Sequence, residues 1–238
     1  MNILISGGAK NGKSMFAQKT ARTMAQEHDV PLYYVATMIP VDGEDEARIR
    51  RHRKERAGWG FETLERGRDL PGLLAGNAKA TDARPDDPET APVEAAVTVA
   101  EGGAEPADPR GVFLLDSVTA LLGNEMFLPD GSVDRNAPER VAEDCVRFAE
   151  MTGSTLFVSD YIYGGAETYE CGAVKTEDPD DLTEAYRRGL ALIDRRLAQV
   201  CDRVVEVSAG CVEDWKTPAD SRPDNIEEYS SEDEQPER

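Results

Sequence analysis

The sequence predicts an α/β protein with a mostly parallel sheet flanked by helices. Two observations predict this fold class. Short apolar and β-branched runs alternate along the chain with longer segments that have apolar residues at helical spacing. A glycine-rich loop also joins the first apolar run to the first helical segment. Strands that alternate with helices in this way form βαβ units, which build parallel sheets.

Five short runs are predicted to be strands. In chain order they are Asn2–Ser6, Leu32–Thr37, Val112–Asp116, Thr155–Ser159 and Arg203–Ser208. The second, LYYVAT, is rich in the β-branched and aromatic residues that strands favour. The third, VFLLD, has the continuous apolar composition of a strand buried inside a sheet. We expect the fifth, RVVEVS, to be the last strand.

Five longer segments are predicted to be helices. They are Ser14–His28, Gly43–Arg56, Val118–Phe127, Pro138–Met151 and Asp181–Val200. The first and the last have apolar side chains three and four residues apart, the pattern of a helix with one buried face. The second is charged along its whole length, with acids at its start and bases at its end. The helix dipole favours that order.

Two segments lie outside this alternation. Residues 76–110 contain eight acids and three bases, and residues 217–238 contain eight acids and two bases. Neither has apolar periodicity, so neither can bury enough apolar surface to offset the loss of chain entropy. We therefore predict a single domain over residues 1–216, a disordered acidic insertion at 76–110 and a disordered acidic tail at 217–238.

The overall composition excludes several function classes. The chain has 27 Lys and Arg residues against 47 Asp and Glu residues, a net charge of −20, which disfavours binding to nucleic acid or to an anionic membrane. Its apolar runs are too short to span a bilayer, its N-terminus lacks the features of a secretory signal, and its four cysteines form no CxxC pair. These features predict a cytoplasmic protein with no nucleic-acid partner and no membrane span.

The sharpest local signal is GGAKNGKS, which fits the phosphate-loop pattern GxxxxGK[ST]. Its glycines let backbone N–H groups surround phosphate oxygens, its lysine contacts the β- and γ-phosphates, and its final hydroxyl binds Mg²⁺. A chance glycine turn is the alternative, but the flanking strand and helix provide the context that the motif requires. The predicted nucleotide-binding residues are Gly7, Gly8, Ala9, Lys10, Asn11, Gly12, Lys13 and Ser14. Among these, Lys13 is also a predicted catalytic residue and Ser14 a predicted magnesium ligand.

A phosphate-loop enzyme also needs an acid at the end of a neighbouring strand to hold the metal, partly through water. Asp116, which ends VFLLD, is the predicted acid. Asp160, which follows the strand that contains LFVS, is the alternative. Asp116 could instead be a helix N-cap residue.

His52 lies in ARIRRHRKER, the densest basic stretch of this acidic chain. Arginines around an imidazole attract a phosphorylated substrate and stabilise the charge that develops as its phosphorus is attacked. A histidine beside a bound triphosphate can therefore act as a covalent nucleophile. The alternative is a surface histidine on a solvated basic helix.

Taken together, the motifs resemble the bifunctional adenosylcobinamide kinase/adenosylcobinamide-phosphate guanylyltransferase family of cobalamin biosynthesis. The resemblance rests, in chain order, on ISGGAKNGKS, YYVAT, DGEDEARIRRHRKER, FETLE, LLDSVTALLGNEMF and LTEAYRRGLALIDRRLAQVCDRVVEVSAG. It implies a P-loop NTPase with a RecA-like sheet, commonly assembled as a homotrimer.

The resemblance also implies two reactions on a corrinoid substrate. In the first, a nucleoside triphosphate such as ATP phosphorylates the aminopropanol hydroxyl of adenosylcobinamide. In the second, a histidine attacks the α-phosphate of GTP, and the resulting GMP–histidine transfers GMP to adenosylcobinamide phosphate. Mg²⁺ is the implied cofactor.

The family's residues map onto this sequence at matching motifs. His52 matches the nucleophilic histidine. Further nucleotide contacts implied by the resemblance are Thr37, Arg53, Lys54, Glu55, Arg56, Glu65 and Asp116.

The sequence departs from the family at three places, one of which is a spacing between His52 and Glu65 that is one residue longer than usual, around Gly58, Trp59 and Gly60. Asp160, Tyr161, Ile162 and Tyr163 stand where the family usually has Asn-Glu-Val-Gly, and the insertion at 76–110 is not a family feature. Two alternatives to the bifunctional enzyme therefore stay open. One is a relative with a single activity, kinase or guanylyltransferase, and the other is a non-catalytic nucleotide-binding switch module.

Overall fold

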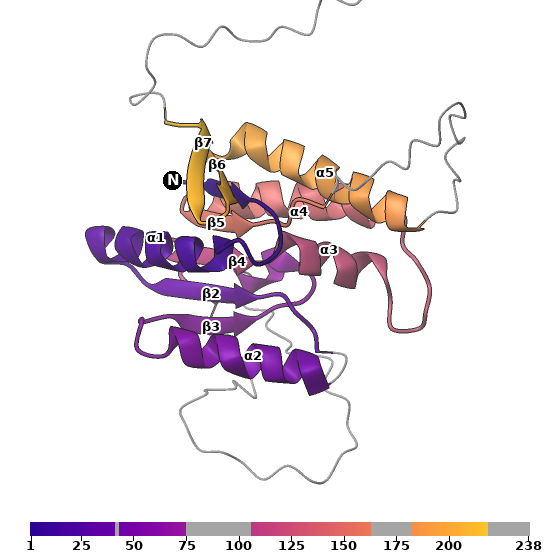
Figure 1. The fold of residues 1–238 in the computed structure, drawn as a ribbon, viewed down its shortest axis with the longest axis horizontal. Helices are drawn as coiled ribbons and strands as arrows, with labels where there is room; N and C mark the ends of the chain where they lie inside the picture. The colour runs from indigo at the N-terminus through magenta and orange to yellow at the C-terminus, as the bar shows by residue number, and fades with distance from the viewer. Residues whose placement is uncertain (41–42, 75–105, 163–181, 219–238) are drawn as a thin grey trace, which may run out of the picture.

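A computed structural model describes residues 1–40, 43–74, 106–162 and 182–218 (Figure 1). Within these residues, seven strands form one sheet. They are β1 (Ile3–Ser6), β2 (Leu32–Ala36), β3 (Glu62–Glu65), β4 (Val112–Asp116), β5 (Thr155–Val158), β6 (Arg203–Ser208) and β7 (Cys211–Lys216). The strand order is β3-β2-β4-β5-β1-β6-β7, and only β7 runs antiparallel to its neighbour. The predicted mostly parallel α/β fold is confirmed.

Five α-helices and one 3₁₀ helix connect the strands in the described part of the chain. They are α1 (Lys13–His28), α2 (Gly43–Arg56), the 3₁₀ helix η1 (Leu70–Leu73), α3 (Val118–Met126), α4 (Ala137–Thr152) and α5 (Leu182–Val200). The predicted helices agree with the observed ones to within a residue at each end. The prediction that RVVEVS is the last strand is wrong, because β7 follows it at the edge of the sheet.

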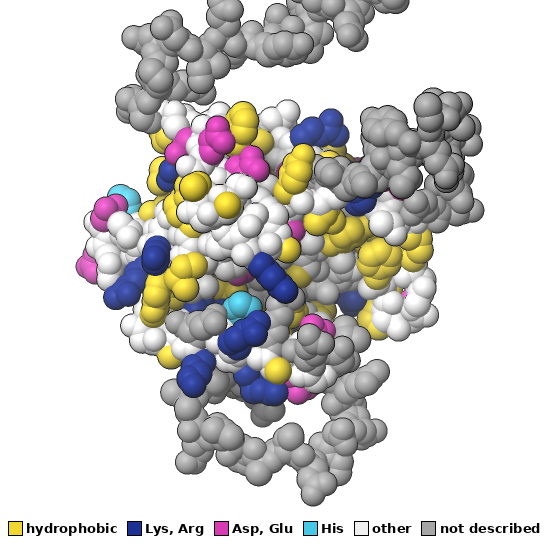
Figure 2. All heavy atoms as spheres, in the orientation of Figure 1, with side chains coloured by type: hydrophobic (Ala, Val, Ile, Leu, Met, Phe, Trp, Pro, Cys, Tyr) yellow, Lys and Arg dark blue, Asp and Glu magenta, His cyan; other side chains and the backbone are white. Residues whose placement is uncertain are grey.

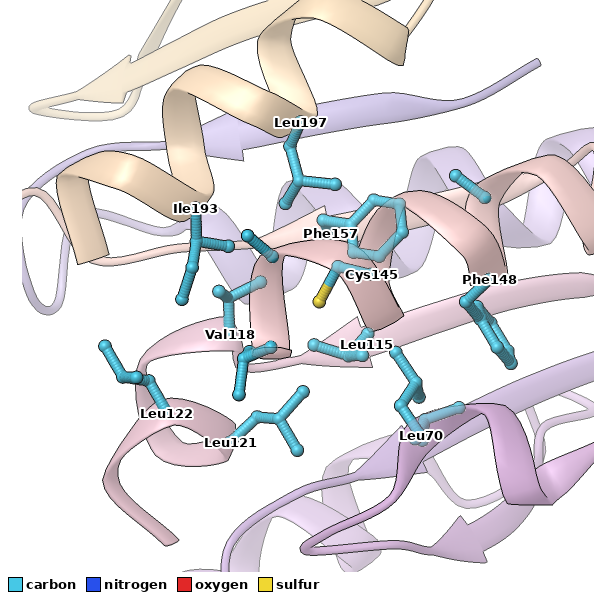
Figure 3. Close-up of a cluster of buried hydrophobic side chains, with 14 of the residues drawn as sticks. Leu70, Leu115, Val118, Leu121, Leu122, Cys145, Phe148, Phe157, Ile193 and Leu197 are labelled. Carbon is cyan, nitrogen blue, oxygen red and sulfur yellow. The ribbon is translucent and has the colours of Figure 1, made fainter. Parts of the chain in front are cut away.

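The side chains of the central strands alternate between two apolar layers. Val112 and Leu114 pack on one face with Ala17 and Ala21 of α1, whereas Phe113 lies on the opposite face. This second layer is the larger and joins the sheet to η1, α3, α4 and α5 (Figure 3). Burial on both faces explains why β4 is apolar at successive positions.

The core corrects one predicted boundary. Ala107 lies within the predicted insertion, yet its side chain is 8% exposed and packs in the larger core layer, and its backbone N–H donates to the carbonyl oxygen of Leu73. Residues 106–110 therefore belong to the folded domain. The predictions for residues 76–105 and for the tail from 219 onward lie outside the described residues.

The described helices include none long and apolar enough to cross a membrane.

Candidate functional site

A cleft of about 1170 Å³ opens at the carboxyl end of the sheet. Because β1, β2, β4 and β5 are parallel, their carboxyl ends meet at one edge, where α/β proteins commonly bind ligands. Residues 7–12, which connect β1 to α1, form one side of this edge, and β4 ends beside them at Asp116. The register pairs Asp116 with Ala36 on β2 and with Val158 on β5. Chain segments distant in sequence therefore converge on one cavity.

The glycines of the phosphate loop are required by its geometry. Gly7 has φ +148°, and a Cβ added there would lie 2.2 Å from the carbonyl oxygen of Val207 on β6. Its own carbonyl oxygen accepts a hydrogen bond from the backbone N–H of Tyr161 at 2.9 Å. Gly12, with φ +92°, is the residue from which α1 begins. The loop thus passes between β6 and the segment after β5 at a position where only glycine fits.

Lys13 is held inside the cleft rather than extended into solvent. Its side chain is only 5% exposed, and its ammonium group donates to the carbonyl oxygen of Gly8 at 2.7 Å and to Oδ1 of Asp160 at 2.8 Å. The loop therefore directs a cation into the part of the cleft where phosphate groups are predicted to bind.

The two candidate acids both line the cleft but have different partners. Asp116 accepts a hydrogen bond from the hydroxyl of Tyr34 through Oδ2 at 2.9 Å. Asp160 forms the ion pair with Lys13, and its backbone N–H donates to Oγ1 of Thr119 at 2.9 Å. The sequence left open which of the two acids holds the metal, and the structure shows that they have different surroundings.

Helix α2 brings His52 to the same cleft. The end of this helix contacts the sheet through Arg56, whose guanidinium carbon lies 3.4 Å from the ring centroid of Tyr34. One turn earlier, Arg53 forms an ion pair with Glu65 of β3. A stacked arginine and an ion pair therefore place a helix with few apolar residues beside the phosphate loop.

The cleft is far less acidic than the chain as a whole. Its lining includes six Lys and Arg residues and five Asp and Glu residues, in a protein of net charge −20. Figure 2 shows dark blue basic side chains gathered over the region of α2. Local clustering of this kind can attract an anionic ligand to a protein that otherwise repels it.

The cleft brings together most of the predicted site residues. Those that line it are Ala9, Lys10, Asn11, Gly12, Lys13, Ser14, His52, Arg53, Arg56, Glu65 and Asp116, together with the alternative acid Asp160. Gly7, Gly8 and Lys54 are not part of its lining, and the side chain of Glu55 lies outside the described residues.

Thr37 lies behind the cleft and does not line it. Its side chain is fully buried, and its hydroxyl donates to the carbonyl oxygen of Ser117 and accepts from the backbone N–H of the same residue, both at 2.8 Å. Asn124 of α3 adds a second brace, because its amide donates to the carbonyl oxygens of Thr37 and Gly67. These contacts hold the ends of β2 and β4 together.

Sequence reasoning missed several cleft residues, of which Tyr34 and Gln18 have the most informative environments. Tyr34, which joins Arg56 to Asp116, was predicted only as part of a strand. Gln18 of α1 is 3% exposed, and no described residue donates to its side-chain oxygen. A polar residue four positions after Ser14 was the available signal, since residues at that spacing share a helix face.

One comparison with known proteins bears on the resemblance found in the sequence. A family model described as cobinamide kinase/cobinamide phosphate guanyltransferase matches residues 3–85, which contain both the phosphate loop and His52. The resemblance found in the sequence is therefore confirmed. No curated protein sequence matches the chain.

Two archaeal structures show limited similarity. The flagellar accessory protein FlaH from Methanocaldococcus jannaschii has 12% identity and a TM-score of 0.38, with 91% of this chain and 78% of that chain covered. A KaiC-like protein from Pyrococcus horikoshii OT3 has 15% identity and a TM-score of 0.38, with 86% and 69% covered. The fold assignment rests on the strand order and not on these similarities.

Proposed function

We propose that the chain, whose residues 3–85 match the cobinamide kinase/cobinamide phosphate guanyltransferase family model, catalyses both reactions of that family in the cleft beside the phosphate loop. The observation that carries the proposal is the position of His52, which lines the same cleft as Lys13 and Ser14 although it lies 38 positions after Ser14 in the sequence. A solvated basic helix unrelated to nucleotide binding would not be expected to contribute its histidine to the cleft of the phosphate loop.

In the kinase reaction, the triphosphate of ATP or GTP binds along residues 7–14. The hydroxyl oxygen of adenosylcobinamide attacks the γ-phosphorus and releases its proton to solvent, the bond from that phosphorus to the β–γ bridging oxygen breaks, and the nucleoside diphosphate leaves with the electron pair. The ammonium of Lys13 stabilises the charge on the β- and γ-phosphate oxygens. Its burial strengthens this interaction, because little water competes with the phosphate for the cation.

In the guanylyltransferase reaction, a ring nitrogen of His52 attacks the α-phosphorus of GTP. A phosphorus–nitrogen bond forms, the α–β phosphoanhydride bond breaks, and pyrophosphate leaves. A phosphate oxygen of adenosylcobinamide phosphate then attacks the same phosphorus and releases His52, which yields adenosylcobinamide-GDP. Arg53 and Arg56, which also line the cleft, stabilise the negative charge in both steps.

The donor set of the cleft fits a magnesium ion. Ser14 and Asp116 supply a hydroxyl and a carboxylate oxygen to the same cavity, and Mg²⁺ prefers oxygen ligands. When bound, Mg²⁺ neutralises phosphate charge. The homotrimer implied by the resemblance stays a prediction.

The proposal is tested by labelling the protein with α-labelled GTP and Mg²⁺. We expect one label per active site, pyrophosphate release, and a bond that is labile in acid but stable in base, as a phosphoramidate is. His52→Asn keeps a polar side chain of similar size but has no nucleophilic ring nitrogen. It should abolish the label and leave GTP binding within about twofold, since the phosphate loop is intact.

His28 provides the matched control, because it is the other histidine of the chain and lies at the end of α1, outside the cleft lining. His28→Asn should be labelled like the wild type. A label that persists in His52→Asn would refute the covalent mechanism. A separate assay of adenosylcobinamide phosphorylation by His52→Asn shows whether the kinase reaction depends on the histidine.

A further inference from the structure

The ion pair between Lys13 and Asp160 is the feature of the cleft that the two reactions do not explain. The ammonium group of a lysine has three donors. Two of them are directed at Gly8 and Asp160, at 2.7 and 2.8 Å. The phosphate loop thus presents a lysine whose charge is already balanced by a carboxylate, at the position where the β- and γ-phosphates of a nucleotide are predicted to bind.

Asp160 is held in this position by several contacts. Its backbone N–H donates to Oγ1 of Thr119, and the carbonyl oxygen of Thr119 accepts from the hydroxyl of Tyr186 at 2.6 Å. Burial raises the pKa of Tyr186 to about 12, so this hydroxyl stays protonated and remains a donor at neutral pH. On the other side, the N–H of Tyr161 is bonded to Gly7. The backbone that bears the carboxylate is therefore tied to α3 and to the phosphate loop.

We propose that Asp160 is the counter-ion of the phosphate-loop lysine and makes nucleotide binding depend on a divalent metal. This inference rests on the proposed nucleotide site. A triphosphate without metal brings several negative charges to Lys13 and must approach the Asp160 carboxylate, whether or not it displaces that group from the lysine. Metal-bound triphosphate carries two fewer negative charges, so the same carboxylate repels it less.

The surroundings of Asp116 indicate that its role differs from that of Asp160. Its partner among the described residues is the neutral hydroxyl of Tyr34, so it balances no cation of the loop. Asp116 is therefore the acid on the metal side of the cleft, and Asp160 is the acid on the lysine side. The two carboxylates should then affect different binding constants. Asp160 should govern the affinity for nucleotide without metal, and Asp116 should govern the affinity for the metal–nucleotide complex.

Calorimetric titration with GTP tests this assignment, once in excess EDTA and once in MgCl₂ at equal ionic strength. Asp160→Asn removes the charge but keeps the shape and an oxygen that can face Lys13. We expect its Kd for metal-free GTP to fall about tenfold, because one unscreened negative charge near the phosphates is lost. Its Kd for Mg–GTP should change less than threefold.

Asp116→Asn is the matched variant, with the same loss of one carboxylate charge from the same cleft. It should weaken Mg–GTP binding about tenfold and change metal-free binding little. Asp160→Ser serves as a second charge-removing variant, and thermal denaturation of each protein verifies that it is folded. If Asp160 had only a structural role, its variants would change the Kd for metal-free GTP and the Kd for Mg–GTP in the same direction.

Two results would overturn the assignment. Asp160→Asn could weaken Mg–GTP binding with no effect on metal-free binding, which would make Asp160 the metal-side acid. It could also leave both constants unchanged. In either case the proposed function would remain supported, provided that the wild-type protein binds Mg–GTP. A wild-type protein that binds no GTP under either condition would instead refute the nucleotide site itself.

Discussion

The two sides of the cleft are built in opposite ways. The phosphate loop lies between buried strands and leads into α1, whose buried face includes Lys13, Ala17 and Ala21. Helix α2 lies at the edge of the sheet, and Arg56 is its one buried residue among those whose side chains are described (Figure 1). One side is positioned by the core, and the other by a few polar contacts.

This difference in packing suggests that the phosphate loop governs nucleotide binding and that α2 governs the transfer of GMP. A loop that is packed at Gly7 and leads into the buried Lys13 can hold a triphosphate in one geometry, since close packing at both ends leaves little room for movement. A helix attached by an arginine–aromatic stack and an exposed ion pair can shift at a small free-energy change. We therefore expect substitutions in the loop to abolish binding or folding, and substitutions that detach α2 to slow the transfer of GMP.

The largest effect is expected for Lys13→Ala. The variant loses the one buried cation of the loop, and both GTP binding and the two reactions should fall about 10²–10³-fold. Lys19→Ala is the control, because Lys19 is an exposed lysine on the same helix and should behave like the wild type. Calorimetry and single-turnover labelling provide the measurements. Wild-type binding by Lys13→Ala would show that the phosphate-loop assignment is wrong.

The next largest effect is expected for Gly7→Ala. The added methyl group would meet the carbonyl oxygen of Val207, so we expect a loss of about 2–4 kcal/mol in the free energy of unfolding. Gly153→Ala is the control. Gly153 also has a positive φ but has no atom within 4 Å of an added Cβ, so its loss should be about 1 kcal/mol. Urea denaturation measures both. Equal losses would contradict the close approach of β6 to the loop.

A smaller effect is expected when α2 is released from the sheet. Arg56→Ala removes both the stack on Tyr34 and one positive charge from the cleft, and we expect His52 labelling to slow about tenfold and stability to fall by about 1–2 kcal/mol. Lys54→Ala changes a neighbouring exposed residue of the helix and should alter neither quantity. If Arg56→Ala destabilised the protein without slowing the labelling, the stack would support the fold but not the position of His52.

The smallest effect is expected for Arg53→Ala. Its ion pair with Glu65 is exposed, so stability should change by less than about 1 kcal/mol, while labelling should slow a few-fold through the loss of one charge beside the phosphates. Glu65→Gln breaks the same ion pair but leaves Arg53 in place. Labelling rates for both variants, at low and high salt, separate the two roles. Equal slowing in both variants would assign the effect to the position of α2 rather than to charge.

Two strands show where prediction from sequence reached its limit. β3 and β7 lie at opposite edges of the sheet and expose most of their side chains, so neither has the buried apolar pattern by which the central strands were predicted. These strands pair through backbone hydrogen bonds with the neighbouring strand, and such pairing does not require a pattern of apolar residues in the sequence. The predicted end of the insertion failed for a related reason, since a single alanine at 107 fills a core position that composition does not reveal.

By itself, the sequence determined the alternation of strands and helices, the phosphate loop and the basic helix with its histidine. Each of these depends on residues adjacent in the chain, whose spacing and backbone preferences act locally. The tertiary structure alone decided that His52 lines the same cleft as Lys13, that Thr37 braces β2 against β4, and that Asp160 pairs with the lysine while Asp116 pairs with Tyr34. These relations join elements that are far apart in the sequence, and their geometry follows from the order and register of the sheet, which no local pattern specifies.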